Sequence, residues 1–167
     1  MHASTDAFRA AMRRFPTGVA IVTTSLEGRI HGFTVNAFAS VSLEPPTVLI
    51  CVNRIATAHR LITAAQCFCA NVLAVEQRSL AERFAGGEPH SRFAGVTYRL
   101  GPSGSPVLDG TVAHVDCRIT EELTASTHTI FLGEVLEAGA REGAPLGYYD
   151  GRYRDFHLPS GTPQDER

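Results

Sequence analysis

Hydrophobic and polar residues alternate along most of this chain, and changes in the period of the alternation mark its elements. Near the N-terminus the apolar residues recur at helical spacing, which predicts a helix over residues 4–15 with Ser4 or Thr5 as its N-cap. Beyond residue 18 the period is mostly two, as in β-strands. Strands are expected over residues 19–25, 33–43, 47–53, 67–73, 111–123 and 127–140, with a short one within residues 145–156.

Short helices and turns separate these strands. A tight turn at residues 26–29 predicts a hairpin, and Pro45 and Pro46 interrupt the next pair of strands. One helix is expected to begin at Thr57, as its N-cap, and to run to about Ala65; another covers residues 75–85. Residues 86–110 are rich in Gly and Pro and predict loops around short extended pieces. The pattern favours a mainly β fold, a small closed antiparallel barrel with a few short helices, over a parallel sheet.

One of the expected strands, over residues 33–43, has an unusual polar side. Its apolar side is expected to face the core and consists of Phe33, Val35, Ala37, Ala39, Val41 and Leu43. The opposite side carries no charge and consists of Thr34, Asn36, Phe38, Ser40 and Ser42. Short donors and acceptors around one aromatic ring suit a neutral ligand with polar edges, although a solvent face that lacks charge by chance is the alternative.

Composition narrows the classes of protein that the pattern allows. With 167 residues and 18.0 kDa the chain is expected to form one domain, with an ordered core over about residues 8–156 and a polar tail over residues 157–167. A net charge of −2 and a pI near 6.4 argue against nucleic acid and anionic membrane as partners. The N-terminus lacks the apolar centre of a signal peptide, and no apolar run is long enough to cross a membrane, so a cytoplasmic protein is expected.

The sequence has no motif for metal binding, hydrolysis or Rossmann-type nucleotide binding. It contains no HExxH, GxSxG, GxGxxG or GxxxxGK[ST] pattern. We therefore expect no metal site. The four cysteines lie in apolar, strand-like sequence, which favours buried free thiols over zinc ligands or a disulfide.

Three short stretches nevertheless contain candidate functional residues. In "CVNRIATAHRLI" a strand gives way to a helix near Thr57, and a helix N-terminus can bind phosphate; an ordinary threonine cap is the alternative. His128 opens a strand after several hydroxyl residues, and it is either functional or a strand-end histidine bonded to the backbone. The tyrosines of "GYYDGRY" could stack on a planar ring or simply close one end of a barrel.

Six segments in order carry a family resemblance over about residues 8–156: "RRFPTGVAIVTT", "GFTVNAFASVSLEPPTVLICVN", "CFCANVLAVEQRSLAERFAG", "GSPVLDG", "STHTIFLGEV" and "YYDGRYR". Together they resemble the flavin reductase family with the split-barrel flavin-binding fold. The resemblance implies an NAD(P)H-dependent flavin reductase that uses NADH or NADPH to reduce FMN or FAD. It also implies a homodimer with its site between two barrels, and a separate oxygenase component that receives the reduced flavin.

The resemblance also implies roles for individual residues. The flavin ring and its ribityl chain would contact the first segment, and the phosphate end would contact the second: Thr34, Val35, Asn36, Ala37, Ser40 and Ser42, then Cys51, Val52, Asn53, Arg54 and Thr57. Arg83 and Phe84, at a helix end, would also reach the flavin, and the nicotinamide side would be formed by His128, Tyr148, Tyr149, Asp150 and Gly151. His128 is the candidate catalytic residue. Ile55 and Ala56 stand where family members often have a serine, which leaves Thr57 as the main phosphate-binding hydroxyl.

Two other functions compete with this interpretation. A relative could keep its flavin and reduce a different acceptor, or the chain could be a flavin- or haem-binding module without turnover. Hydride transfer between two stacked rings needs few acids or bases from the protein, which agrees with the absence of a catalytic triad. Arg152 and Arg154 could meet the 2′-phosphate of NADPH, although two arginines near a chain end are more often solvated.

Overall fold

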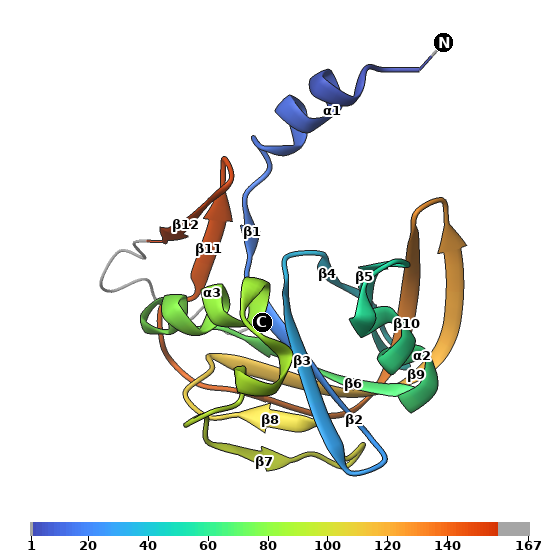
Figure 1. Ribbon diagram of the computed structural model, residues 1–167, viewed down its shortest axis with the longest axis vertical. Coiled ribbons are helices and arrows are strands. Elements are labelled where there is room, and N and C mark those ends of the chain that lie inside the picture. The colour runs from blue at the N-terminus through green and yellow to red at the C-terminus, as the bar shows by residue number, and fades with distance from the viewer. Residues whose placement is uncertain (1, 157–167) are drawn as a thin grey trace.

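An antiparallel sheet of seven strands forms the body of the protein. The computed structural model describes residues 2–156 (Figure 1), so the expected polar tail lies outside the described residues. The strand order is β3-β2-β6-β9-β10-β5-β4. The strands are β2 (Ala20–Leu26), β3 (Arg29–Val35), β4 (Phe38–Leu43), β5 (Pro46–Asn53), β6 (Cys67–Val72), β9 (Ala113–Ala125) and β10 (His128–Ala140).

Two smaller sheets and a few short helices complete the described chain. The smaller sheets consist of β1 (Thr17–Gly18), β11 (Leu146–Tyr149) and β12 (Arg152–Asp155), and of β7 (Tyr98–Leu100) and β8 (Pro106–Leu108). The helices are α1 (Thr5–Met12), α2 (Thr57–Ala65), α3 (Arg78–Gly86) and the 3₁₀ turns η1 (Val75–Gln77) and η2 (Pro89–Ser91). The mainly β class is confirmed. The pairing leaves β3 and β4 at the two ends of the large sheet, so closure of the barrel is not confirmed.

The core consists of two apolar clusters that fix the helices next to β3. Phe68, Phe131 and Ile62 lie in the larger cluster, which joins α2 to the inner face of the sheet. Phe84 of α3 lies in the second cluster, and its side chain is fully buried. Figure 1 shows α2 and α3 on either side of β3, and both helices contact this strand.

The expected strand over residues 33–43 is two strands with opposite phases. The chain breaks after Val35, and β4 leaves β3 to pair with β5. Because the break shifts the alternation, Phe38 packs against the core, whereas Ala39, Val41 and Leu43 are exposed. The prediction of a core face is therefore correct for β3 and wrong for β4.

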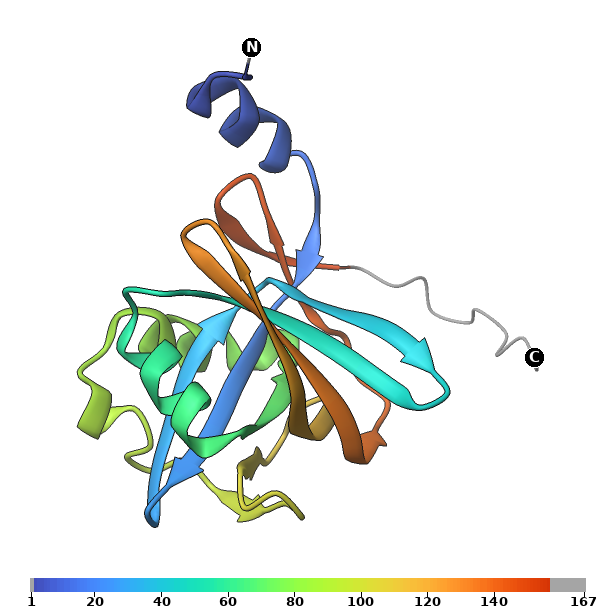
Figure 2. The ribbon, with the colours of Figure 1, turned by 90° about the vertical axis from the view of Figure 1, so that its right-hand side faces the viewer.

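The N-terminal helix projects from the body of the molecule (Figures 1 and 2). Ser4 is its N-cap, as one of the two sequence alternatives proposed, and its side chain accepts a hydrogen bond from the backbone of Ala7 at 3.2 Å. No residue of α1 is buried, and its apolar side chains Phe8 and Met12 are 63% and 49% exposed. The apolar stripe of α1 therefore has no partner within the described residues of its own chain.

The cysteines are free thiols, three of them buried and Cys51 half-buried. Burial, with the nearby Asp116 carboxylate, raises the pKa of Cys117 to about 12, so this thiol is unreactive at neutral pH.

Within residues 2–156, no helix has the length and apolarity needed to cross a membrane.

Candidate active site

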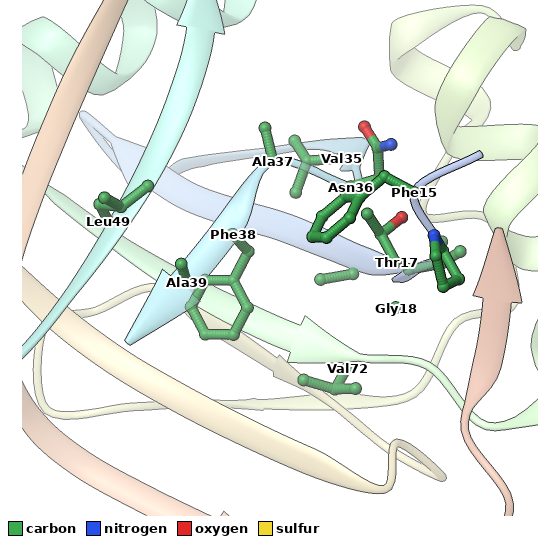
Figure 3. A pocket seen from close by; sticks show the side chains of 13 residues that line it. Phe15, Thr17, Gly18, Val35, Asn36, Ala37, Phe38, Ala39, Leu49 and Val72 are labelled. Carbon is green, nitrogen blue, oxygen red and sulfur yellow. The ribbon is translucent and has the colours of Figure 1, made fainter. Parts of the chain in front are cut away.

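Three neighbouring cavities lie along β3 and share wall residues, and we refer to the three together as the trough. The first, which we call the β3–β4 cavity, has a volume of about 410 Å³ and lies where β3 breaks off (Figure 3). Val35 and Asn36 form one wall of this cavity, and Phe15 and Thr17 of the N-terminal segment face them. The remaining wall is apolar and includes Phe38, Ala39, Leu49 and Val72.

The other two cavities continue the trough towards α2. The tyrosine cavity, of about 200 Å³, is lined by Val19, Thr34, Val35, Asn36, Ala85, Tyr148 and Tyr153. The α2 cavity, of about 440 Å³, is lined by residues of β3, α2, α3 and the loop after α3, among them His31, Thr34, Thr57, Phe84, Ala85 and Arg92. Each cavity shares wall residues with the next, Asn36 on one side and Thr34 on the other.

The trough combines apolar walls with a few polar groups. None of the residues that line its three cavities is acidic. The Thr17 hydroxyl is buried and has no hydrogen-bond partner within residues 2–156. Tyr148 and Tyr153 meet edge to face, with ring centroids 5.6 Å apart. Apolar walls with a small number of polar groups are typical of a site for a planar ligand with polar edges.

The N-terminus of α2 borders the trough with unused donors. Thr57 is the first helical residue rather than the N-cap, so the sequence prediction is off by one residue. The reason is Asn53, whose side-chain oxygen accepts from the backbone of Ile55 at 3.1 Å and whose carbonyl accepts from Ala56 at 3.0 Å. Ala56 thus becomes the N-cap and offers no side-chain bond, so the Thr57 hydroxyl and the first N–H groups are left for a ligand.

The side of the trough next to α3 is rigid. The Thr34 hydroxyl donates to the carbonyl of Ala81 at 2.7 Å, which ties β3 to the helix. Phe84 is fully buried and forms the floor of the α2 cavity. The Arg83 guanidinium donates to the carbonyl of Ala94 at 2.7 Å, so it braces the loop after α3 rather than pointing into the trough.

Several residues that sequence reasoning assigned to the flavin lie outside the three cavities. Ser40 is exposed on β4, and the Ser42 hydroxyl takes part in the turn before Pro46. The Val52 side chain is 3% exposed in the core, so only its backbone could meet a ligand. Cys51 and Asn53 lie on β5 and Arg54 directly follows it, and none of the three lines a cavity of the trough.

The two segments expected on the nicotinamide side lie apart within one chain. His128 follows the turn between β9 and β10 and pairs with Asn53, and its Nδ1 lies 2.9 Å from the Thr127 hydroxyl. Tyr148 to Gly151 belong to the hairpin of β11 and β12, which pairs with β1. Figure 1 shows the two hairpins on opposite sides of β3 and β4. Tyr148 lines the tyrosine cavity, whereas His128 lines none of the three cavities.

Sequence reasoning missed the N-terminal wall of the trough. Phe15 was assigned to a helix end, Val19 to a strand and Thr17 to the break between them, and nothing in their local pattern shows that they fold against Asn36. His31 and Arg92 were missed in the same way. Only the motif "RRFPTGV" could have drawn attention to this segment.

Two ionisable groups in the trough have shifted pKa values. Burial, and to a lesser degree the charge of Arg29, lower the pKa of His31. Burial, followed by the charges of Tyr148 and Glu82, raises the pKa of Tyr153. His31 and Tyr153 are therefore neutral at pH 7, and the trough is nearly uncharged apart from Arg92.

Comparison with known proteins agrees with this geometry. Residues 12–157 match the flavin reductase like domain. The chain belongs to the flavin reductase family. The match covers most of the chain and includes every segment that borders the trough.

Similar proteins of this family include reductase components of larger systems. The chain is 42% identical over 146 residues to the FMN reductase (NADH) RutF of Stutzerimonas stutzeri, covering 87% of this chain and 84% of the relative. It is 40% identical over 157 residues to HsaB of Rhodococcus jostii, the reductase subunit of a flavin-dependent monooxygenase, with 93% and 80% covered. The structure of the NADH:FAD oxidoreductase SgcE6 of Streptomyces globisporus, solved with NAD and FAD fragments, has a TM-score of 0.86, 38% identity, and 92% and 93% coverage.

The residues of the trough fit a flavin. The β3–β4 and tyrosine cavities offer apolar walls, two tyrosines and the unpartnered Thr17 hydroxyl to a planar ring with polar edges. The start of α2 offers donors to a phosphate at the other end. The absence of carboxylates along the trough removes the repulsion that a phosphate would otherwise meet.

Proposed function

We propose that this protein is an NAD(P)H:flavin oxidoreductase that reduces FMN or FAD and supplies the reduced flavin to a separate monooxygenase component. The observation that carries the proposal is the set of neighbouring cavities along β3, with a ring-sized apolar cavity at one end and a helix N-terminus at the other, in a flavin reductase family chain. Relatives named as monooxygenase reductase subunits support the link to an oxygenase.

The chain's residues would act mainly by positioning. Thr57 and the first N–H groups of α2 would bind the phosphate, and Asn36 and Thr17 would bond to polar edges of the ring. The apolar walls would exclude water from the reacting face. Bound flavin accepts hydride from the nicotinamide ring, so the protein needs no general acid or base of its own.

We further propose that the active form is a homodimer in which the partner copy completes the nicotinamide side. Alternate residues of β5 and β10 point to the outer face of the sheet, and β4, β9 and the mouth of the β3–β4 cavity border them. The middle of this outer face is apolar and includes Ala39, Leu49, Cys51, Leu123, Ile130 and Leu132, with Glu121 of β9 beside Leu132. An apolar surface of this kind is typical of a protein interface.

His128 lies on the same outer face, at the end of the apolar row. In a dimer, the partner's copy of that histidine would approach the trough. His128 of one copy and Tyr148 of the other could then contact the same nicotinamide, although the two residues lie apart within one chain. His128 would thus contact the nicotinamide ring from the partner copy.

Steady-state oxidation of NADH with increasing free flavin tests the function. A reductase that treats flavin as a substrate oxidises NADH in proportion to the added FMN or FAD. A protein that retains its flavin would show a rate independent of added flavin, and a binding module would show no rate. Repeating the titration with NADPH and with FAD assigns the preferred donor and flavin.

A further inference from the structure

One side-chain hydrogen bond links α2 to the sheet. Among the residues of α2, only His59 makes a side-chain hydrogen bond to another element within residues 2–156. Its Nε2 lies 2.8 Å from the hydroxyl of Thr129 on β10. Thr129 is only 4% exposed, so its hydroxyl depends on His59 rather than on bulk water for a partner.

This bond holds α2 from the side that faces away from the α2 cavity. Thr57 and Ala58 line the cavity, whereas His59 does not. Successive residues of a helix are rotated by about 100°, so the His59 side chain projects to nearly the opposite side. Its ring packs against Phe131 of the core, with ring centroids 5.5 Å apart. His59 therefore fixes the position of a cavity wall without forming part of that wall.

Other contacts hold the chain before and after the first turn of α2. Before the helix, the backbone N–H of Arg54 donates to the carbonyl of Thr127 at 3.0 Å. One turn into the helix, Ile62 is buried in the core. Ala56, the N-cap, offers no side-chain bond. The orientation of the first turn therefore depends on the bond made by His59.

A phosphate in the α2 cavity would need the first turn in one orientation. Hydrogen bonds weaken steeply when donor and acceptor are misaligned, and a wall that must be ordered by its ligand lowers the affinity for that ligand. The ring of a flavin, placed in the other two cavities of the trough, makes no such demand on α2.

We propose that His59 is a positioning residue, which through Thr129 fixes the α2 wall and thereby sets the preference for phosphorylated flavins over riboflavin. It acts through the helix and touches neither the flavin nor the nicotinamide. Thr57, in contrast, would bond to the phosphate directly. The inference rests on the proposed function, because it concerns the phosphate end of the same site.

Equilibrium titrations with FMN and with riboflavin test the inference in wild type and in Thr129→Val. Valine removes the hydroxyl and leaves no unpaired buried group on β10, while the half-buried His59 can still reach water. The variant should bind FMN about threefold to tenfold more weakly, with riboflavin affinity nearly unchanged. Thr129→Ser keeps the hydroxyl and should bind FMN like wild type.

A double variant shows whether the two side chains act through one bond. His59→Ala/Thr129→Val should weaken FMN binding no more than His59→Ala alone, because the first substitution already removes the bond. Additive losses would show that the two residues act independently, and would overturn the inference. Failure of Thr129→Ser to restore FMN binding would do the same.

Thr111→Val is the matched control for the loss of a buried hydroxyl. Thr111 is buried, its hydroxyl donates to the carbonyl of Leu108 at 3.1 Å, and it lines no cavity of the trough. Melting curves should show a loss of stability in this control, with the ratio of FMN to riboflavin affinity as in wild type. A ratio lowered equally in the control and in Thr129→Val would overturn the inference.

Three results for Thr129→Val itself would also overturn it. Unchanged FMN binding would show that the bond does not matter for the ligand. Equal losses for FMN and riboflavin would show a general structural role. A raised NADH requirement with unaltered flavin affinity would show that the bond supports His128 instead.

The outcomes separate this inference from the proposed function, because the titrations contain no NADH. Protein whose FMN preference depends on His59 and Thr129 but which does not reduce added flavin would contradict the proposed function alone. Protein that reduces flavin while Thr129→Val keeps the wild-type ratio of affinities would contradict only the role of His59.

Discussion

Thr57 tests the phosphate end of the trough at the scale of one residue. Its hydroxyl is not used as a helix cap and borders the α2 cavity. Thr57→Ala should weaken FMN binding by about 1 kcal/mol, several-fold in affinity, and should leave riboflavin binding nearly unchanged. Fluorescence titrations with both flavins measure the two affinities.

Thr63 provides the control on the same helix. Its hydroxyl is buried without a hydrogen-bond partner in the described residues and lines none of the three trough cavities. Thr63→Ala should leave the ratio of FMN to riboflavin affinity as in wild type. If Thr57→Ala lowered both affinities equally, the assignment of the phosphate to α2 would be wrong.

The lowered pKa of His31 predicts that the stability of the protein depends on pH. Its pKa in the folded protein lies below the ordinary value near 6.5, mainly because of burial. As the pH falls through this window, the unfolded chain binds a proton that the folded chain resists, so the free energy of unfolding decreases. His31→Gln removes this contribution and should reduce the loss of melting temperature between about pH 7.5 and about pH 5.5. An equal loss in wild type and variant would contradict the shift.

At the scale of elements, the close contact of β3 with α3 shapes the α2 cavity. A Cβ atom on Gly32 would lie 2.7 Å from the ring of Phe84, which is fully buried and cannot move aside. Gly32→Ala should therefore lower the free energy of unfolding by about 1–3 kcal/mol. Gly86, at the end of α3, has open space around its Cα, so Gly86→Ala should change stability by less than about 1 kcal/mol.

Thermal or denaturant unfolding of the two glycine variants measures this difference. Equal stability of Gly32→Ala and wild type would show that β3 and α3 are not packed as tightly as described. A loss in Gly86→Ala as large as that in Gly32→Ala would show that the cost comes from the helix and not from the contact.

The type and order of the elements were predictable from sequence, but two local features were not. Alternation identified β3 and β4 as strand sequence, yet it could not show the break after Val35 that reverses the faces of β4. Threonine is a common N-cap, but the bonds from Asn53 start α2 one residue earlier than Thr57 alone suggests. In both cases a specific hydrogen-bond pattern overrides a general preference.

For the whole molecule, the outer face of the sheet predicts the assembly. Leu132 lies in the middle of the apolar residues that β4, β5 and β10 place on the outer face of the sheet. Leu132→Lys should convert a dimer to a monomer and lower reductase activity, because a charge would be buried at the interface. Leu100 on β7 is 58% exposed outside this row, so Leu100→Lys should leave the dimer intact.

Sedimentation velocity at micromolar protein distinguishes these states. A monomeric wild type with full reductase activity would contradict the dimer, and so would an unchanged sedimentation coefficient in Leu132→Lys.

Only part of the site could be predicted from sequence at this scale. Residues Thr34 to Ala37 form one continuous segment that lines the cavities, and their composition, which is local information, was enough to single them out; their contact with flavin stays a prediction. The opposite wall comes from Phe15 and Thr17, and the position of His128 depends on the sheet order, so both depend on long-range packing that alternation does not encode.

The central claim, that the trough binds flavin as a diffusing substrate for reduction, is tested most directly by an anaerobic reaction. Purified protein is mixed with NADH and with free FMN in roughly tenfold molar excess over protein, and the oxidised flavin absorbance is followed. The account predicts that nearly all of the FMN loses this absorbance, with one NADH consumed for each flavin reduced. Reduction of only one flavin per protein, or of none with either NADH or NADPH, would contradict it.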